Sequence, residues 1–93
     1  MAHTFDELVE KQRAANEAHA RALELRDAYG APTAASWTGE QHDTYETAWR
    51  AWRDLARDTQ AAVTEYARSE SRPRNEVEAE VKKAAPTAPT GDD

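Results

Sequence analysis

Hydrophobic and aromatic side chains recur every three or four residues over positions 45–66, which is the strongest periodic pattern in the chain. The stripe comprises Tyr45, Ala48, Trp52, Leu55, Thr59, Ala62 and Tyr66, and it is widened by Trp49, Ala56 and Val63. Charged side chains occupy the intervening positions, as on an amphipathic helix. Thr38 and Gln41 have the spacing of a capping box, and Pro73 cannot continue a helix. We therefore predict a helix of about four heptads between Thr38 and Pro73.

A weaker stripe predicts a first helix upstream. It comprises Phe5, Leu8, Ala15, Ala22 and Tyr29, with Ala18 and Leu25 alongside, and it is interrupted by Gln12, His19 and Arg26. Thr4 and Glu7 have capping-box spacing at its start. Gly30 suits the left-handed position that follows a helix, and Pro32 prevents its continuation. The sequence thus predicts an all-α fold, an antiparallel two-helix hairpin.

Trp37-Thr38-Gly39 lies at the corner between the two predicted helices, after the short, small and polar connector 31–36. We expect Trp37 to close the end of the hairpin and Gly39 to allow close approach of the chain. The alternative is that this turn motif forms a notch that recognises a partner protein.

The chain after the hairpin contains signals for a short third helix. Asn75 and Glu78 have capping-box spacing, but a helix within 73–85 would be marginal in isolation because of its length. The end of the chain is rich in Pro, Thr and Ala, which is typical of disorder. We therefore divide the chain into a helical hairpin at 1–72, a short marginal helix at 73–85 and a disordered tail at 86–93.

The second helix presents more apolar surface than an Ala-rich first helix covers. Either the segment after residue 73 folds back on it or a second chain does. We favour a dimer, homomeric or heteromeric, that forms a four-helix bundle, and a monomeric three-helix fold stays open. The residues expected in the core or at this interface are Tyr45, Trp49, Trp52, Leu55, Val63 and Tyr66.

Length and charge restrict the classes of function. A chain of 93 residues is one domain at most, and its formal net charge of -6 opposes binding to phosphate backbones. A helix-turn-helix that binds DNA is accordingly the least favoured hypothesis, since no basic recognition helix is present. No apolar run reaches the ~20 residues that span a bilayer, so we expect no membrane insertion. The N-terminus lacks the features of a Sec signal peptide, so we expect a cytoplasmic protein or one exported by another route.

We expect no enzymatic activity, because the sequence lacks the patterns that catalytic and metal sites need. The chain has no Cys, and His3, His19 and His42 have no spacing typical of metal ligands. No Gly-rich phosphate loop or nucleophile elbow occurs. We therefore predict no catalytic residues, no metal and no cofactor, and we interpret the three histidines as solvated surface.

The corner motif and the aromatic spacing suggest a family. Trp37-Thr38-Gly39, with Tyr45 eight and Trp52 fifteen positions after the Trp, resembles the WXG superfamily of type VII (ESX) secretion systems in actinobacteria and firmicutes. The resemblance covers roughly residues 4–70. It implies a helical hairpin that dimerises with the later aromatics on the inner face of its second helix. Many members carry a Tyr-x-x-x-Asp/Glu export signal, and Tyr66 with Glu70 matches that spacing.

Two functions remain in view from the sequence. The first is a non-enzymatic helical-hairpin interaction protein similar to a type VII secretion substrate or partner. The alternative is a small acidic cytosolic adaptor or regulator, of the kind encoded on mobile elements, that binds another protein. In the alternative the Trp-x-Gly motif is coincidental packing.

Overall fold

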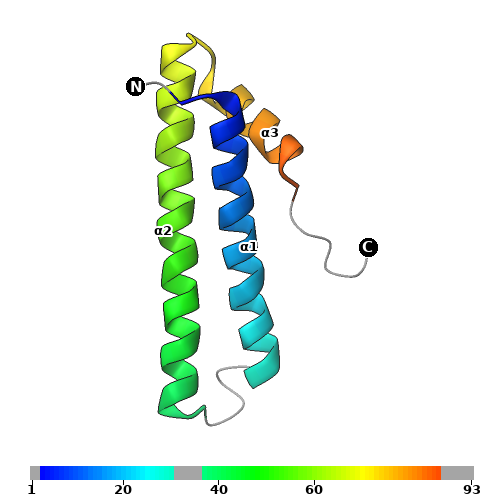
Figure 1. The fold of residues 1–93 in the computed structure, drawn as a ribbon, viewed down its shortest axis with the longest axis vertical. Helices are drawn as coiled ribbons and strands as arrows, with labels where there is room; N and C mark the ends of the chain where they lie inside the picture. Colours follow the sequence, from blue (N-terminus) through cyan, green and yellow to red (C-terminus); the bar gives the residue numbers. More distant parts are fainter. Residues whose placement is uncertain (1–2, 31–36, 87–93) are drawn as a thin grey trace.

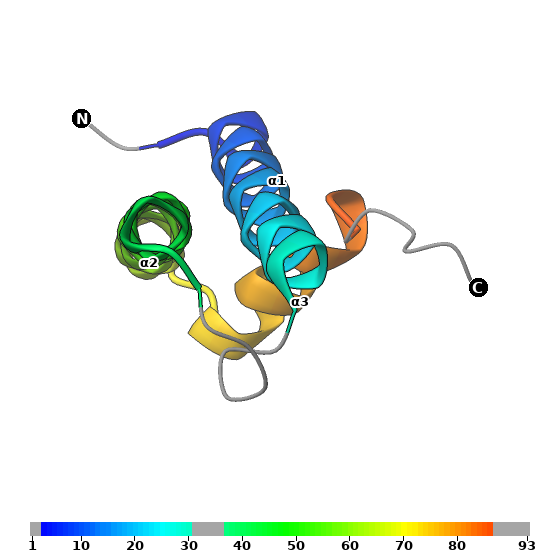
Figure 2. The same ribbon diagram turned by 90° about the horizontal axis from the view of Figure 1, so that it is seen from below.

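The computed structural model describes residues 3–30 and 37–86, which form three helices. Helix α1 spans Phe5–Tyr29, α2 spans Gly39–Ser69 and α3 spans Arg74–Ala84. Helices α1 and α2 lie side by side and run in opposite directions, and α3 crosses one end of the pair (Figures 1 and 2). The described part of the chain contains no strand, so the all-α prediction is confirmed. The predicted connector 31–36 and all but Pro86 of the predicted tail lie outside the described residues.

Both long helices begin at the predicted capping boxes. The Thr4 N–H donates to the Glu7 carboxylate over 2.9 Å, and the Glu7 N–H donates to the Thr4 hydroxyl over 3.1 Å. Thr38 and Gln41 make the same reciprocal pair, with both distances at 3.0 Å. Each box satisfies two backbone donors that the first helical turn leaves free. Gly30 caps the end of α1 at a φ of 86°, a backbone conformation that favours glycine.

Helix α2 ends in a Schellman motif built on a serine. The Arg72 N–H donates to the Ala67 carbonyl over 2.9 Å, and the Ser71 N–H donates to the Arg68 carbonyl over 3.2 Å. This pair of bonds requires a left-handed residue after the helix, and Ser71 supplies it at a φ of 54°. The turn redirects the chain so that α3 can fold back over the end of the helix pair (Figure 1).

The predicted capping box of α3 is wrong. The helix begins at Arg74, one residue before Asn75, with Pro73 at the cap position and no side-chain hydrogen bond there. Glu78 is instead used for ion pairs with Arg74 at 2.9 Å and Lys82 at 3.1 Å along α3. Pro73 favours this start because its fixed φ suits the beginning of a helix, so the first turn forms without a side-chain cap.

An aliphatic core lies where α3 meets the other two helices. The buried residues of this cluster are Leu8 from α1, Ala62, Val63 and Ala67 from α2, and Val77 and Val81 from α3. Phe5 and Tyr66 pack against it from the sides, with their ring centroids 6.2 Å apart. Val77 and Val81 are one turn apart, so they present a single apolar face of this short helix to the long pair.

Polar contacts hold α3 to the hairpin around this core. Arg72 lies 2.5 Å from Glu80, and this hydrogen bond lowers the pKa of the Glu80 carboxyl and raises that of Arg72. Lys82 and then Arg74 lower the pKa of Glu78. Arg74 also donates to the Thr64 hydroxyl of α2 over 3.0 Å. These groups are charged at neutral pH and connect α3 to α2 and to the turn before it.

Helix α3 is too short to cover the whole pair. Its 11 residues extend about 16 Å and the 31 residues of α2 about 46 Å, at ~1.5 Å per residue. The molecule measures 50 × 30 × 18 Å, so α2 sets its long axis. The segment after residue 73 therefore does fold back on the hairpin, but it covers only one end (Figure 1).

We predict that Ser71→Gly stabilises the protein by about 1 kcal/mol. A left-handed conformation costs a non-glycine residue roughly 1–2 kcal/mol, and glycine adopts it freely. Urea unfolding followed by circular dichroism would measure the change. Ala61→Gly is the control, because it places glycine at an exposed position inside α2 and should destabilise by about 1 kcal/mol. A Ser71→Gly protein no more stable than the parent would contradict the assigned turn.

Candidate functional site

Aromatic rings follow one another along the half of the helix pair that α3 leaves uncovered. Trp37 contacts Tyr45 at a centroid distance of 5.2 Å, Tyr45 lies 6.2 Å from Trp49, and Trp49 lies 4.8 Å from Trp52. His19 of α1 then stacks on Trp52 at 4.5 Å with an interplanar angle of 26°. We call these five residues the aromatic ladder.

The ladder is half-exposed over most of its length. Trp37 is 9% exposed and closes the end of the pair, where Tyr29 packs edge-on at 5.4 Å. Tyr45, Trp49 and Trp52 are only half-buried. Within the described residues the indole N–H of Trp37 has no acceptor. The rings therefore shield one another in part, and Tyr45, Trp49 and Trp52 each keep some surface accessible to solvent.

The ladder lies on the same side of the helix pair as α3. A groove of about 360 Å³ begins where α3 ends. It is walled by Gln12, Asn16 and His19 of α1, Trp52 and Gln60 of α2, and Lys82 of α3. The Asn16 side chain donates to the Ala85 carbonyl over 2.8 Å and so fixes the end of α3 beside α1. The aliphatic core under α3 and the aromatic ladder are thus successive parts of one face.

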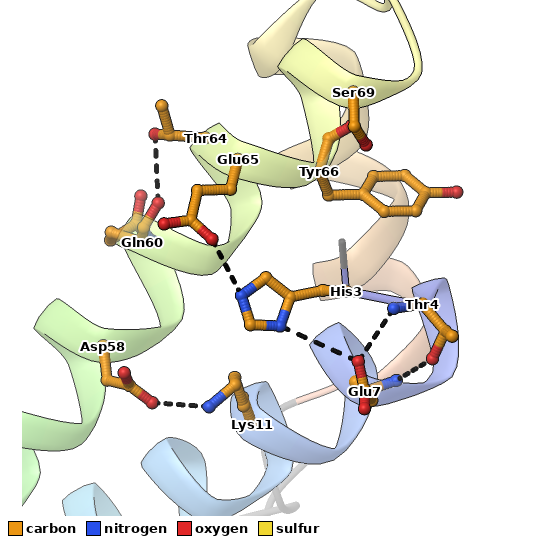
Figure 3. Close-up of polar contacts among 10 residues, drawn as sticks. All are labelled: His3, Thr4, Glu7, Lys11, Asp58, Gln60, Thr64, Glu65, Tyr66 and Ser69. Carbon is orange, nitrogen blue, oxygen red and sulfur yellow. Dashed lines mark hydrogen bonds and ion pairs between the residues drawn. The ribbon is translucent and has the colours of Figure 1, made fainter. Parts of the chain in front are cut away.

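The edge of the pair that faces away from α3 is polar. Lys11 lies 2.6 Å from Asp58, and the His3 imidazole lies 3.0 Å from Glu65 and 3.7 Å from Glu7 (Figure 3). Asp58 is two residues before Gln60, whose side chain contacts α3, so the two point to roughly opposite sides of α2. Polar contacts occupy this edge, among them the Lys11–Asp58 ion pair between α1 and α2, and the accessible aromatics lie on the other edge.

The structure divides the residues predicted for the core or an interface into two groups. Val63 is buried and Tyr66 half-buried in the core covered by α3. The other four predicted residues, Tyr45, Trp49, Trp52 and Leu55, are half-buried on the part of α2 that α3 does not reach. Val63 and Tyr66 therefore belong to the core that α3 covers, and the other four residues lie on the part of the face beyond α3.

The corner motif differs in part from its prediction. Trp37 is buried at the end of the hairpin, as expected, and Thr38 caps α2. Gly39, however, is the first residue of α2, and a Cβ added there would meet no described atom within 4 Å. The expected close approach of the chain at Gly39 is therefore not observed among the described residues.

The two residues of the predicted export element have different environments. Tyr66 is half-buried against Phe5 and the aliphatic core. Glu70 is exposed and is the C-terminal cap of α2, with its backbone N–H on the Tyr66 carbonyl at 2.9 Å. Only Glu70 is therefore freely accessible in the folded chain.

Two histidines that the sequence suggested were solvated lie between helices. His3 and His19 are half-buried, the first between two carboxylates and the second on Trp52. His42 is exposed, although its ring lies 5.0 Å from Trp37. The signal for His19 was the heptad spacing of the polar interruptions at Gln12, His19 and Arg26, which marks a common edge of α1.

The described residues contain neither a candidate metal site nor a candidate membrane-spanning helix. Over 3–30 and 37–86, no three His, Asp or Glu side chains come together in a way that could hold a metal ion. No helix described here has both the length and the apolar composition to cross a bilayer. Comparison of the chain with protein-family models, curated proteins and solved structures gave no match. The aromatic contacts make the aromatic ladder and its surroundings the candidate functional site.

We predict that Gly39→Ala leaves the fold intact and stabilises it by up to about 1 kcal/mol. Alanine is a better helix former than glycine, and the described surroundings leave space for its methyl group. Thermal unfolding would measure the effect, with Gly30→Ala as the control that should destabilise because of its positive φ. A clear loss of stability in Gly39→Ala would restore the structural role expected from the sequence.

Proposed function

We propose that this protein is a non-enzymatic interaction module that binds a helical protein partner through the aromatic ladder. The single observation that carries the proposal is the ladder itself, three half-buried aromatic rings on the part of the α1–α2 face beyond α3. Trp and Tyr are enriched at protein interfaces, where they supply large contact areas and few rotamers are lost.

The shape of the face favours a helix as the occupant. The groove between α1 and α2 already accepts one amphipathic helix, α3, through Val77 and Val81. The same groove continues past Lys82 and Ala85 to the aromatic ladder. A partner helix with apolar residues at helical spacing would extend the packing that α3 begins, in the helix-in-groove mode of recognition.

We further propose that the interaction belongs to a type VII secretion pathway, as the resemblance to the WXG superfamily implies. Trp37 at the hairpin end and the aromatic side chains after it on α2 support this proposal. Glu70, exposed at the end of the second helix, is placed where a secretion component could contact it. Helix α3 lies outside the residues that the resemblance covers, and the resemblance does not predict it.

We predict that the protein forms a complex of about twice its mass, either with itself or with a helical-hairpin protein encoded beside it. Sedimentation equilibrium of the chain alone and of the mixture would measure this. Trp49→Gln should weaken association by at least about tenfold, because it removes an aromatic anchor from the interface.

Ala51→Gln is the matched control, since Ala51 is exposed on α2 and lies two residues away, toward the edge opposite α3. Circular dichroism would verify that both variants keep their helix content. A chain that stays monomeric alone and in the mixture, at concentrations up to millimolar, would contradict the proposed function.

We predict that Glu70→Gln abolishes export of a tagged chain in a host with a type VII system. The substitution removes the charge of an exposed residue and leaves the core around Tyr66 unchanged, so intracellular levels should not fall. Immunoblots of medium and cells would measure the distribution, with Glu76→Gln on α3 as the control. Equal export of Glu70→Gln and the parent would show that Glu70 is not part of an export signal. Equal export from a strain lacking the secretion ATPase would show that the type VII pathway does not export this chain.

A further inference from the structure

The groove that begins where α3 ends has the size of a small-molecule site. Its volume of about 360 Å³ lies near the lower limit of the ~300–1,000 Å³ that such sites occupy, which suits a ligand of one or two fused rings. Ala15, Thr59 and Ala85 line it and are almost fully buried, so they form its floor. Because these side chains are small, the groove stays open above them.

His19 and Trp52 form an aromatic wall of this groove. The imidazole stacks on the indole at a centroid distance of 4.5 Å and an angle of 26°, and the pair joins α1 to α2. Both side chains are half-buried, so the wall keeps accessible surface. Aromatic rings pack well against other rings in offset or edge-on contacts, so this wall favours a planar, aromatic ligand.

Three amide side chains in the lining have defined orientations. Asn16 donates to the Ala85 carbonyl over 2.8 Å, and its side-chain oxygen accepts from Gln12 over 2.9 Å. The side-chain oxygen of Gln60 accepts from the Arg74 guanidinium. These bonds leave the Gln12 oxygen and the Gln60 amino group without a partner among the described residues. The groove therefore presents an oriented donor and an oriented acceptor, which suit the edge of a heteroaromatic ring.

Lys82 makes one end of the groove positive. Among the described residues that line the groove, it is the only Lys, Arg, Asp or Glu. Its ammonium lies 3.1 Å from Glu78, but Arg74 lies 2.9 Å from the same carboxylate, so two cations share one anion. An ammonium has three N–H donors, and the bond to Glu78 leaves the others for a ligand. A single unbalanced positive charge suits a carboxylate better than a doubly charged phosphate.

We infer that this groove binds a small planar heteroaromatic carboxylate. The ring packs against His19 and Trp52, a ring nitrogen accepts a hydrogen bond from the Gln60 amino group, and the carboxylate pairs with Lys82. This ligand site goes beyond the proposed function and does not depend on it. A bound ring would nevertheless cover part of the surface at Trp52 that a partner helix needs.

Three compounds of one shape test the chemistry of the ligand. Quinoline-3-carboxylate has the ring nitrogen and the charge, quinoline-3-carboxamide lacks the charge, and 2-naphthoate has carbon in place of the nitrogen. Titrations of the ¹⁵N-labelled whole chain at neutral pH, followed by ¹H–¹⁵N correlation spectra, should give a dissociation constant of about 1 mM or below for the first compound. The other two should bind at least about fivefold more weakly, because each loses one polar contact.

Lys82→Gln tests the position of the carboxylate. It should weaken binding of quinoline-3-carboxylate at least about fivefold and leave binding of the carboxamide unchanged, because only the first compound has a charge to lose a partner. Lys83→Gln is the matched control, since Lys83 is exposed on α3 and is not part of the lining. Circular dichroism would verify that both variants keep their helix content. An equal loss of binding in the two variants would overturn the assigned contact.

The spectra also locate the site. Saturable shifts centred on His19, Trp52 and the side-chain amides of the groove, with the quinoline carboxylate binding most tightly, would support the inference. It would be overturned by the absence of saturable shifts at millimolar concentration, or by a carboxamide or naphthoate that binds as tightly. Either result leaves the proposed partner complex to be decided separately, because sedimentation measures that complex without any of these compounds.

Discussion

The mismatch in length between α3 and the helix pair governs the rest of this structure. Two antiparallel helices bury only the strip where they touch, and a third helix must cover the apolar face that remains. Here that third helix has 11 residues against the 31 of α2. One end of the pair becomes a three-helix core, and at the other end the two long helices lie side by side without α3 (Figure 1).

The residues on the face change where the cover ends. Under α3 the side chains are aliphatic and small, such as Leu8, Val63 and Ala67, because a neighbouring helix fills the space above them. Beyond α3 they are Trp and Tyr, which are large enough to pack against one another without a third helix. Their partial exposure follows from the same geometry, because α3 does not extend over these rings. The surface that we propose as a binding site is therefore produced by the shortness of α3.

The sequence contained local signals for the start of both long helices and for the end of the first. Thr4 with Glu7 and Thr38 with Gln41 signalled two helix starts through local hydrogen bonds, and Gly30 signalled an end through its backbone freedom. These effects act within a few residues, so they can be predicted from a short segment of the sequence. The end of α2 was harder, because Ser71 adopts a left-handed conformation usually given to glycine. No local signal marks a serine for that position.

The periodicity of the sequence also did not predict which part of the α1–α2 face α3 covers. The stripe along α2 continues unchanged from Tyr45 to Tyr66, although α3 covers only its second half. Which part is covered depends on where the turn at Ser71 sends α3, and that is a long-range property. Likewise His19 interrupts the apolar stripe of α1 in the sequence but stacks on Trp52 across the groove. Its partner is 33 positions away, so only the packing of the two helices identifies it.

This division bears on what the resemblance to the WXG superfamily implies. A full-length four-helix bundle requires the α1–α2 face to be open along its whole length, but Val77 and Val81 already fill one end of it. Association through this face must therefore be partial while α3 stays in place, and it is concentrated on the aromatic half. Arg74 with Thr64 of α2, and Asn16 of α1 with Ala85, hold α3 near both of its ends, so a partner would not displace it without breaking contacts to both long helices. The chain thus covers one end of the hairpin with part of its own length and leaves the other end, with Trp49 and Trp52, uncovered by α3.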